Sequence, residues 1–174
     1  MGLSNAILSL ASDQKYKTLG IATGQGSVLF IKLLLNTQGN TIYQEVPLVE
    51  KLSPNEWPAV SISNMEIGTK SYFVVAFLSG LIKIFRADTG VIVCELSAHS
   101  RQVCGLVCGK KNNKNVIATC SDDTFINLWE VSSNNDTWAV EIKLIESHRI
   151  ADTFLTGICF LGYNKGPLIA SVYD

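Results

Sequence analysis

The chain has 174 residues, of which 47% are hydrophobic and only 17% are charged. This composition excludes an intrinsically disordered protein, because disorder goes with low hydrophobicity and high charge. Fourteen Lys and Arg against fifteen Asp and Glu leave a net charge of −1, which excludes the strongly basic surface expected for binding to nucleic acid or to an anionic membrane.

The predicted elements are short strands bounded by turn residues. They are rich in Val, Ile, Phe and Tyr, and no window of about eleven residues shows the apolar spacing of a long helix. Some strands, such as residues 27–35, are apolar on both faces, which is typical of a covered sheet. The sequence therefore predicts an all-β fold. In chain order the strands cover residues 5–10, 19–23, 27–35, 41–49, 60–62, 72–77, 81–85, 91–96, 103–108, 116–120, 125–131, 140–145 and 168–172.

Three parts of the chain repeat the same order of strand, tight turn and strand. Gly80 follows Gly26 by 54 residues and Thr124 follows Gly80 by 44 residues, at equivalent turn positions. Ile31, Phe85 and Trp129 are equivalent on the strand after the turn. These offsets are close to the period of roughly 40–45 residues in four-stranded propeller repeats. One more strand precedes each pair and one follows it, which is the pattern of a propeller blade.

We therefore expect a single partial β-propeller over residues 1–174. Blade-like units cover approximately residues 5–50, 58–97 and 101–146, and an incomplete unit covers residues 153–174. These units make about three and a half four-stranded antiparallel blades, whereas a seven-bladed ring needs roughly 290 residues. The propeller is accordingly expected to be open rather than closed, either as a fragment or as one piece of a ring that a neighbouring chain completes.

The third unit carries a specific signature. Residues 117–130 (IATCSDDTFINLWE), preceded by Ala98-His99, resemble the repeat of the WD-repeat β-propeller family, with AH for the usual GH and WE for the usual WD. Residues 79–174 resemble one subfamily of these proteins in particular. The resemblance implies a non-catalytic cytoplasmic propeller.

The resemblance also implies a structural hydrogen-bond tetrad of His99, Thr119, Asp123 and Trp129. In the family these bonds run from the Trp indole through Thr and His to the Asp carboxylate. A buried indole N–H needs an acceptor, and a neutral His needs partners that fix its tautomer. The bond to an ionised Asp is charge-assisted and therefore stronger.

The other units depart from this pattern. Gln25 and Ile31 in the first unit, and Ser79 and Phe85 in the second, stand where the family has Asp and Trp. We therefore expect the first two blades to be held by apolar packing alone. In the fourth unit, Ser-His-Arg at residues 147–149 is similar to the AH position and is expected in a loop.

Catalysis and phosphate binding are both disfavoured. His99 and Asp123 suggest a hydrolase with Ser100, Ser121 or Thr119 as nucleophile, but the sequence has no G-x-S-x-G elbow. Three glycines lie within residues 20–26, yet a strand rather than a helix follows them, so no helix N-terminus is available for phosphate. We expect no enzyme activity and no cofactor.

Metal binding and export are also disfavoured. The sequence has no C-x-x-C or H-x₃-H pair, so no metal is expected. It also lacks a secretory signal and a run of about 18 apolar residues, so we expect a cytoplasmic protein with no membrane insertion. The cysteines are then reduced core residues. They are Cys94, Cys104, Cys108, Cys120 and Cys159.

The leading interpretation is a protein–protein interaction scaffold, with other proteins as partners and no nucleic acid. Propellers bind through loops at one end of the ring, and Arg and Trp contribute most to interface energetics. The candidate interaction face consists of Ser100, Arg101, Asp122, Arg149, Asp152 and Trp57. The alternative is an architectural subunit of a cytoskeletal or ciliary assembly, in which neighbouring chains complete the ring.

Overall fold

The structure is a computed structural model that describes residues 6–46, 57–134, 136–161 and 166–173. In these residues the chain forms antiparallel sheets that follow one another in sequence. Blade 1 consists of β1 (Ile7–Asp13), β2 (Thr18–Thr23), β3 (Val28–Leu35) and β4 (Thr41–Val46). Blade 2 consists of β5 (Ala59–Ile67), β6 (Lys70–Phe77), β7 (Leu81–Arg86) and β8 (Ile92–Ser97). Blade 3 consists of β9 (Val103–Lys111), β10 (Lys114–Ser121), β11 (Phe125–Ser133) and β12 (Val140–Arg149), and blade 4 of β13 (Phe154–Phe160) and β14 (Leu168–Tyr173).

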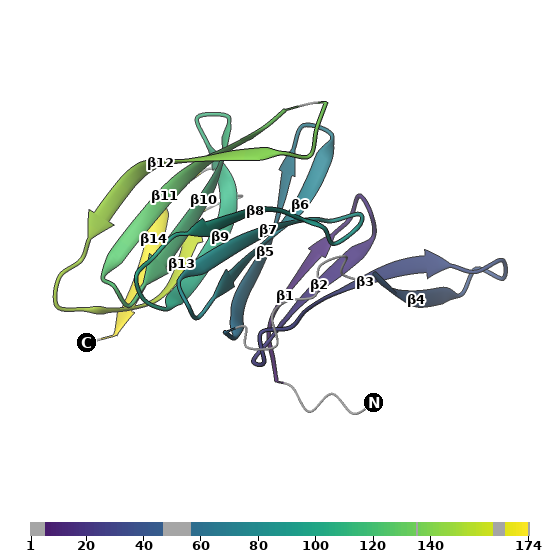
Figure 1. Cartoon of the computed structure of the whole chain (residues 1–174), viewed down its shortest axis with the longest axis horizontal. Coiled ribbons are helices and arrows are strands. Elements are labelled where there is room, and N and C mark those ends of the chain that lie inside the picture. Colours follow the sequence, from purple (N-terminus) through teal and green to yellow (C-terminus); the bar gives the residue numbers. More distant parts are fainter. Residues whose placement is uncertain (1–5, 47–56, 135, 162–165, 174) are drawn as a thin grey trace.

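The four sheets stand side by side like the blades of a fan (Figure 1). The first strands of successive sheets are neighbours, so that β1 lies beside β5, β5 beside β9 and β9 beside β13. In the part of the chain that the structure describes, three sheets are four-stranded and one is two-stranded, and together they do not close a ring. The predicted all-β class and the open, partial propeller are confirmed. The predicted end of the fourth strand at residues 47–49 lies outside the described residues.

The repeat positions identified in the sequence occupy the same place in each blade. Gly26, Gly80 and Thr124 all have positive φ, at 79°, 89° and 71°. Each lies in the tight turn before the third strand of its blade, where a residue with positive φ helps to reverse the chain. Glycine is required at position 80, because a Cβ there would collide with the carbonyl oxygen of His99.

Apolar side chains fill the spaces between blades. Between blades 1 and 2, the ring of Phe30 stacks on Phe73 at 5.1 Å between centroids and meets Phe85 edge-on at 5.4 Å. Ile117 and Trp129 of blade 3 join the cluster on the other face of blade 2. Seven of the eight residues of β6 are buried, because this strand is covered on both faces. Such coverage explains why so few residues are charged.

The junction of blades 1 and 2 also contains a buried polar network, so the expectation of apolar packing alone is wrong. Asp13, only 2% exposed, ends β1. Its carboxylate accepts hydrogen bonds from the amide of Tyr16 at 2.7 Å, from Asn64 Nδ2 at 3.1 Å and from the hydroxyl of Ser71. A buried carboxylate is tolerated only when donors surround it, and both blades supply them here.

Two further expectations need correction. β12 continues to Arg149, so residues 147–149 lie on a strand and not in a loop. Their polar side chains fit a strand because β12 is the outer edge of blade 3 and faces solvent. Of the five cysteines, Cys108 and Cys120 are buried but Cys159 is exposed, because it lies on the uncovered face of the blade 4 hairpin. Among the described residues, no helix is long and apolar enough to cross a membrane.

Candidate functional site

The structure brings the four tetrad residues into one chain of hydrogen bonds. The indole Nε1 of Trp129 donates to Thr119 Oγ1 at 3.1 Å, and Thr119 Oγ1 lies 2.8 Å from His99 Nε2. The other ring nitrogen of His99, Nδ1, lies 3.0 and 3.1 Å from the two carboxylate oxygens of Asp123. Thr119 lies on β10 and Trp129 on β11. Asp123 lies in the β10–β11 turn, and His99 lies in the loop between β8 and β9.

The partners fix the protonation of His99. The Asp123 carboxylate can only accept, so Nδ1 carries the hydrogen, and Nε2 accepts from the Thr119 hydroxyl. Burial lowers the pKa of His99 below its ordinary value of 6.5, although the nearby Asp123 charge opposes the shift. His99 is therefore neutral at pH 7 and serves as a fixed connector between Thr119 and Asp123.

Asp123 also organises the loops on either side of it. Its carboxylate accepts from the amide of Ser100 at 3.0 Å and from the amide of Phe125 at 3.1 Å. Burial would raise the pKa of Asp123, but the Phe125 amide, the His99 ring and the Ser100 amide outweigh it and lower the pKa below its ordinary range. One ionised side chain thus ties the β8–β9 loop to the β10–β11 turn.

These groups are not arranged for nucleophilic catalysis. Thr119 is completely buried, so a substrate cannot reach its hydroxyl. Ser121 is also buried, and its hydroxyl donates to the carbonyl oxygen of Arg101 at 3.3 Å. The hydroxyl of Ser100 lies 3.5 Å from Asp123 but not next to the His99 ring nitrogens, whose contacts are Thr119 and Asp123. The residues described by the structure include no cluster of three His, Cys, Asp or Glu side chains suited to a metal ion.

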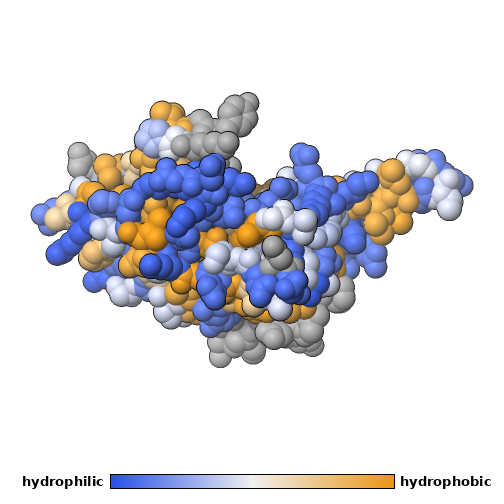
Figure 2. Space-filling model, turned by 90° about the horizontal axis from the view of Figure 1, so that it is seen from above, coloured by the Kyte–Doolittle hydropathy of each residue, from blue (hydrophilic) through white to orange (hydrophobic). Residues whose placement is uncertain are grey.

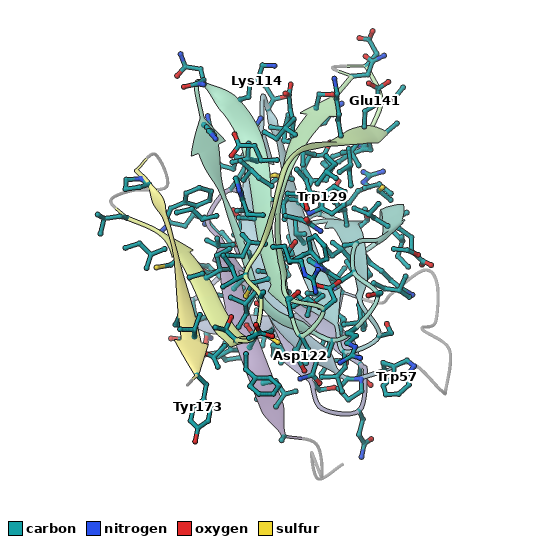
Figure 3. All side chains as sticks on the ribbon, turned by 90° about the vertical axis from the view of Figure 1, so that its left-hand side faces the viewer. Trp57, Lys114, Asp122, Trp129, Glu141 and Tyr173 are labelled. Carbon is teal, nitrogen blue, oxygen red and sulfur yellow. The ribbon has the colours of Figure 1, made fainter. Side chains whose placement is uncertain are left out.

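The six candidate interaction residues lie at one end of the sheets, and we call them the loop face. Figure 3 shows Trp57 and Asp122 at this end and Lys114 and Glu141 at the opposite end. Trp57 precedes β5 and is 59% exposed. The loop face comprises Trp57, Ser100, Arg101, Asp122, Arg149 and Asp152.

The tetrad and its neighbours hold several loop-face residues in place. Asp122 accepts a bond from Cys104 Sγ at 3.0 Å, and its amide donates to the carbonyl of Gln102. Burial, followed by the bond to Asp122, raises the pKa of Cys104 to about 12, so this thiol stays protonated. Arg149 Nε lies 3.4 Å from Thr124 Oγ1.

The remaining loop-face residues are exposed, although the Ser100 hydroxyl also lies 3.5 Å from Asp123. Ser100, Arg101 and Asp152 are all exposed, and Asp152 has a positive φ of 59°. Exposed polar side chains on a backbone that hydrogen bonds have fixed can contact a partner without large ordering costs.

Sequence reasoning missed a second cluster, at the opposite end of the sheets. The ring of Trp138 lies under the guanidinium of Arg86 at 4.1 Å and meets Tyr72 edge-on at 5.4 Å. Tyr16 of blade 1 lies 6.5 Å from the same ring, and Arg86 is paired with Asp88 at 2.7 Å. Trp138 thus joins three blades. The only signal in the sequence was an aromatic residue directly after the polar residues 134–137.

Comparisons with known proteins identify a family for part of the chain and relate its fold to solved structures. The profile of the WDR54 family matches residues 57–174. Human WD repeat-containing protein 54 is 26% identical over 96 residues, which are 55% of this chain and 28% of that protein. The rat WD repeat domain 54 protein is 24% identical over the same shares. The matched segment therefore spans well under a third of the length of these relatives.

Solved structures share the fold at low sequence identity. The structure of U3-55K has a TM-score of 0.65 and 15% identity, and the match covers 98% of this chain and 46% of that one. The computationally designed Ika4 protein has a TM-score of 0.61 and 15% identity, over 99% of this chain and 94% of that one. These likenesses support the blade architecture and no particular activity.

Proposed function

The chain belongs to the WDR54 family of WD-repeat proteins, and from this premise we propose that it is a non-catalytic scaffold that binds another protein through the loop face. WD-repeat proteins are generally non-catalytic, which agrees with the inaccessible hydroxyls around His99. The five cysteines are free thiols, which supports a cytoplasmic location as part of the proposal.

The observation that carries the proposal is that loops with a fixed backbone carry exposed side chains suited to contact a partner. Asp123 connects the β8–β9 loop to the β10–β11 turn by hydrogen bonds. Arg101, Arg149 and Trp57 are exposed at the same end of the sheets. Arg and Trp are the residue types that most often dominate binding energy at protein interfaces. A rigid scaffold that presents variable loops is the usual way in which repeat folds bind partners.

Affinity capture from extracts of the source cells, read by quantitative mass spectrometry, tests the proposal. The Arg101→Glu/Arg149→Glu variant reverses both charges on the loop face and should lose at least one protein that the unchanged chain captures. The matched control is Lys110→Glu/Lys143→Glu, which makes the same charge change at two exposed residues outside the loop face and should keep that protein. Equal capture by all three chains contradicts the proposal.

A second candidate function is an architectural subunit whose ring neighbouring chains complete, in a cytoskeletal or ciliary assembly. It is favoured by exposed apolar side chains on the outer faces of the first and last sheets, for which Leu10 is 56% and Ile169 45% exposed. Exposed apolar surface of this kind favours burial against another chain. An assembly in solution that Ile169→Glu dissociates would support this function, and a monomer at all concentrations would contradict it.

A further inference from the structure

The β3–β4 hairpin forms an arm that extends away from the rest of the molecule (Figure 1). An apolar patch lies on this arm beside its hydrophilic tip in the space-filling view (Figure 2). Leu35 is 65% exposed, Tyr43 74% and Ile42 44%. Within the described residues, β4 pairs only with β3, so its second edge is an open row of backbone donors and acceptors.

β4 lacks the register shift that the outer strands of the other blades have. Outer strands normally avoid edge-to-edge pairing through charged residues, Pro or β-bulges. β8 and β12 each pair with their neighbour across a register shift, and β12 carries several charged side chains. β4 pairs with β3 without a shift and carries one charge, Glu45. An edge with regular pairing and a single charge is suited to accept another strand.

We propose that β4 pairs antiparallel with β4 of a second copy of this chain, with Tyr43 opposite its own counterpart. The two arms then form one four-stranded sheet in the order β3-β4-β4-β3. This contact lies outside residues 57–174, the part that matches the WDR54 family, and it does not involve the loop face.

The register follows from the residues of the arm. Tyr43 already lies opposite Leu33 of β3, and directly opposed side chains point to the same side of a sheet. Pairing about Tyr43 therefore aligns Leu33, Tyr43 and their two counterparts in one apolar row across four strands. It also places Ile42 opposite Gln44, and Thr41 opposite Glu45.

The same register suits a second copy of this chain as the occupant. The single charged residue of β4, Glu45, meets a neutral Thr41 and not another Glu45, so no like charges face each other. A two-fold axis through Tyr43 keeps the contact near the tip of the arm, away from Val46, which packs against the core of blades 1 and 2. Two arms can then meet edge to edge without contact between the blades.

The test is a dilution series of the 174-residue chain by sedimentation velocity. We expect a monomer–dimer equilibrium for the unchanged chain. Tyr43→Lys sets two like charges opposite each other and removes the aromatic pair, so it should raise the dissociation constant about tenfold or more. Tyr43→Glu should do the same. An equimolar mixture of Tyr43→Lys and Tyr43→Glu should restore the dimer, because opposite charges then face each other.

Leu144→Lys is the matched control, since Leu144 is a 46% exposed apolar residue on the outer strand of blade 3. This variant should dimerise like the unchanged chain, and thermal unfolding should show that all variants are folded. A monomer at every concentration overturns the proposal. The partner of the β4 edge would then be a strand from a different protein. A dimer that survives Tyr43→Lys, or a mixture that fails to restore it, also overturns the proposal.

Discussion

Blades 1 and 3 have the same strand order, but different interactions hold them. In blade 3, Thr119, Asp123 and Trp129 form a polar chain with His99 at the loop end. In blade 1 the positions equivalent to these three are Ile21, Gln25 and Ile31, which cannot form it. Blade 1 is attached to blade 2 instead by stacked aromatic rings and by the Asp13 network near the opposite end.

The difference shows that the polar tetrad is not required for the blade fold. Blade 1 forms four strands without it, held by apolar residues, a left-handed turn and the Asp13 network. The tetrad adds a fixed geometry at the loop end, where Asp123 connects two loops. The first blade, which lacks the tetrad, is also the blade with the projecting arm.

The largest effect should come from the aromatic junction of blades 1 and 2. Phe73 is completely buried and stacks on Phe30. Phe73→Ala leaves a cavity in this junction and should lower the free energy of unfolding by about 3–5 kcal/mol. Urea denaturation measures the loss. A loss as small as that of a surface substitution would show that blade 1 is not held by these rings.

Asp13→Ala should have the next largest effect. The substitution leaves the buried hydroxyl of Ser71 and the amide of Tyr16 without the carboxylate that accepts from them, which costs about 1–3 kcal/mol. Hydrogen exchange should become faster in β1 and at the Tyr16 amide, and the exchange of β10 and β11 should not change. Faster exchange in blade 3 instead would contradict the assignment of this network to the first junction.

Trp129→Phe should cost less. The ring still fills most of the core site, but the bond from the indole to Thr119 is lost, at a net cost of about 0.5–1.5 kcal/mol. Thr119 keeps its contact with His99. The equivalent change in blade 1, Ile31→Leu, is a control without a polar partner, and thermal unfolding compares the two. Equal stability of Trp129→Phe and the unchanged chain would refute the contribution of the indole bond.

The smallest effect is the dependence of stability on pH through His99. Because the pKa of His99 in the folded chain is below 6.5, the unfolded chain takes up a proton at a higher pH than the folded chain does. The contribution of neutral His99 to the free energy of unfolding is therefore complete above pH 6.5 and falls as the pH decreases below that value. The melting temperature should fall more between about pH 7.5 and about pH 5 in the unchanged chain than in His99→Gln. An equal fall in melting temperature in both chains would contradict a neutral, buried His99.

The sequence predicted what is local and repeated. The four tetrad residues lie within a stretch of 31 residues, from His99 to Trp129, and their spacing is set by three consecutive strands, β9 to β11, and the loop before β9. The turn positions Gly26, Gly80 and Thr124 were found for the same reason. Periodicity alone therefore predicted the blades and their order.

What the sequence did not predict depends on contacts between blades. Asp13 meets Ser71 from 58 positions away, and Trp138 meets Tyr16 and Arg86 of two different blades. No spacing within a repeat encodes such contacts. The end of β12 was missed because its residues are polar, and an outer strand that faces solvent needs no apolar pattern.

The central claim is that the loop face is the surface that binds the partner. Hydrogen–deuterium exchange of the chain, alone and with the protein lost in the Arg101→Glu/Arg149→Glu capture experiment, tests it most directly. We predict slower exchange on binding at residues 99–102, 121–124 and 149–153, and no change at residues 134 and 136–141, at the opposite end. Protection confined to the opposite end, or to the β3–β4 arm, would contradict the claim.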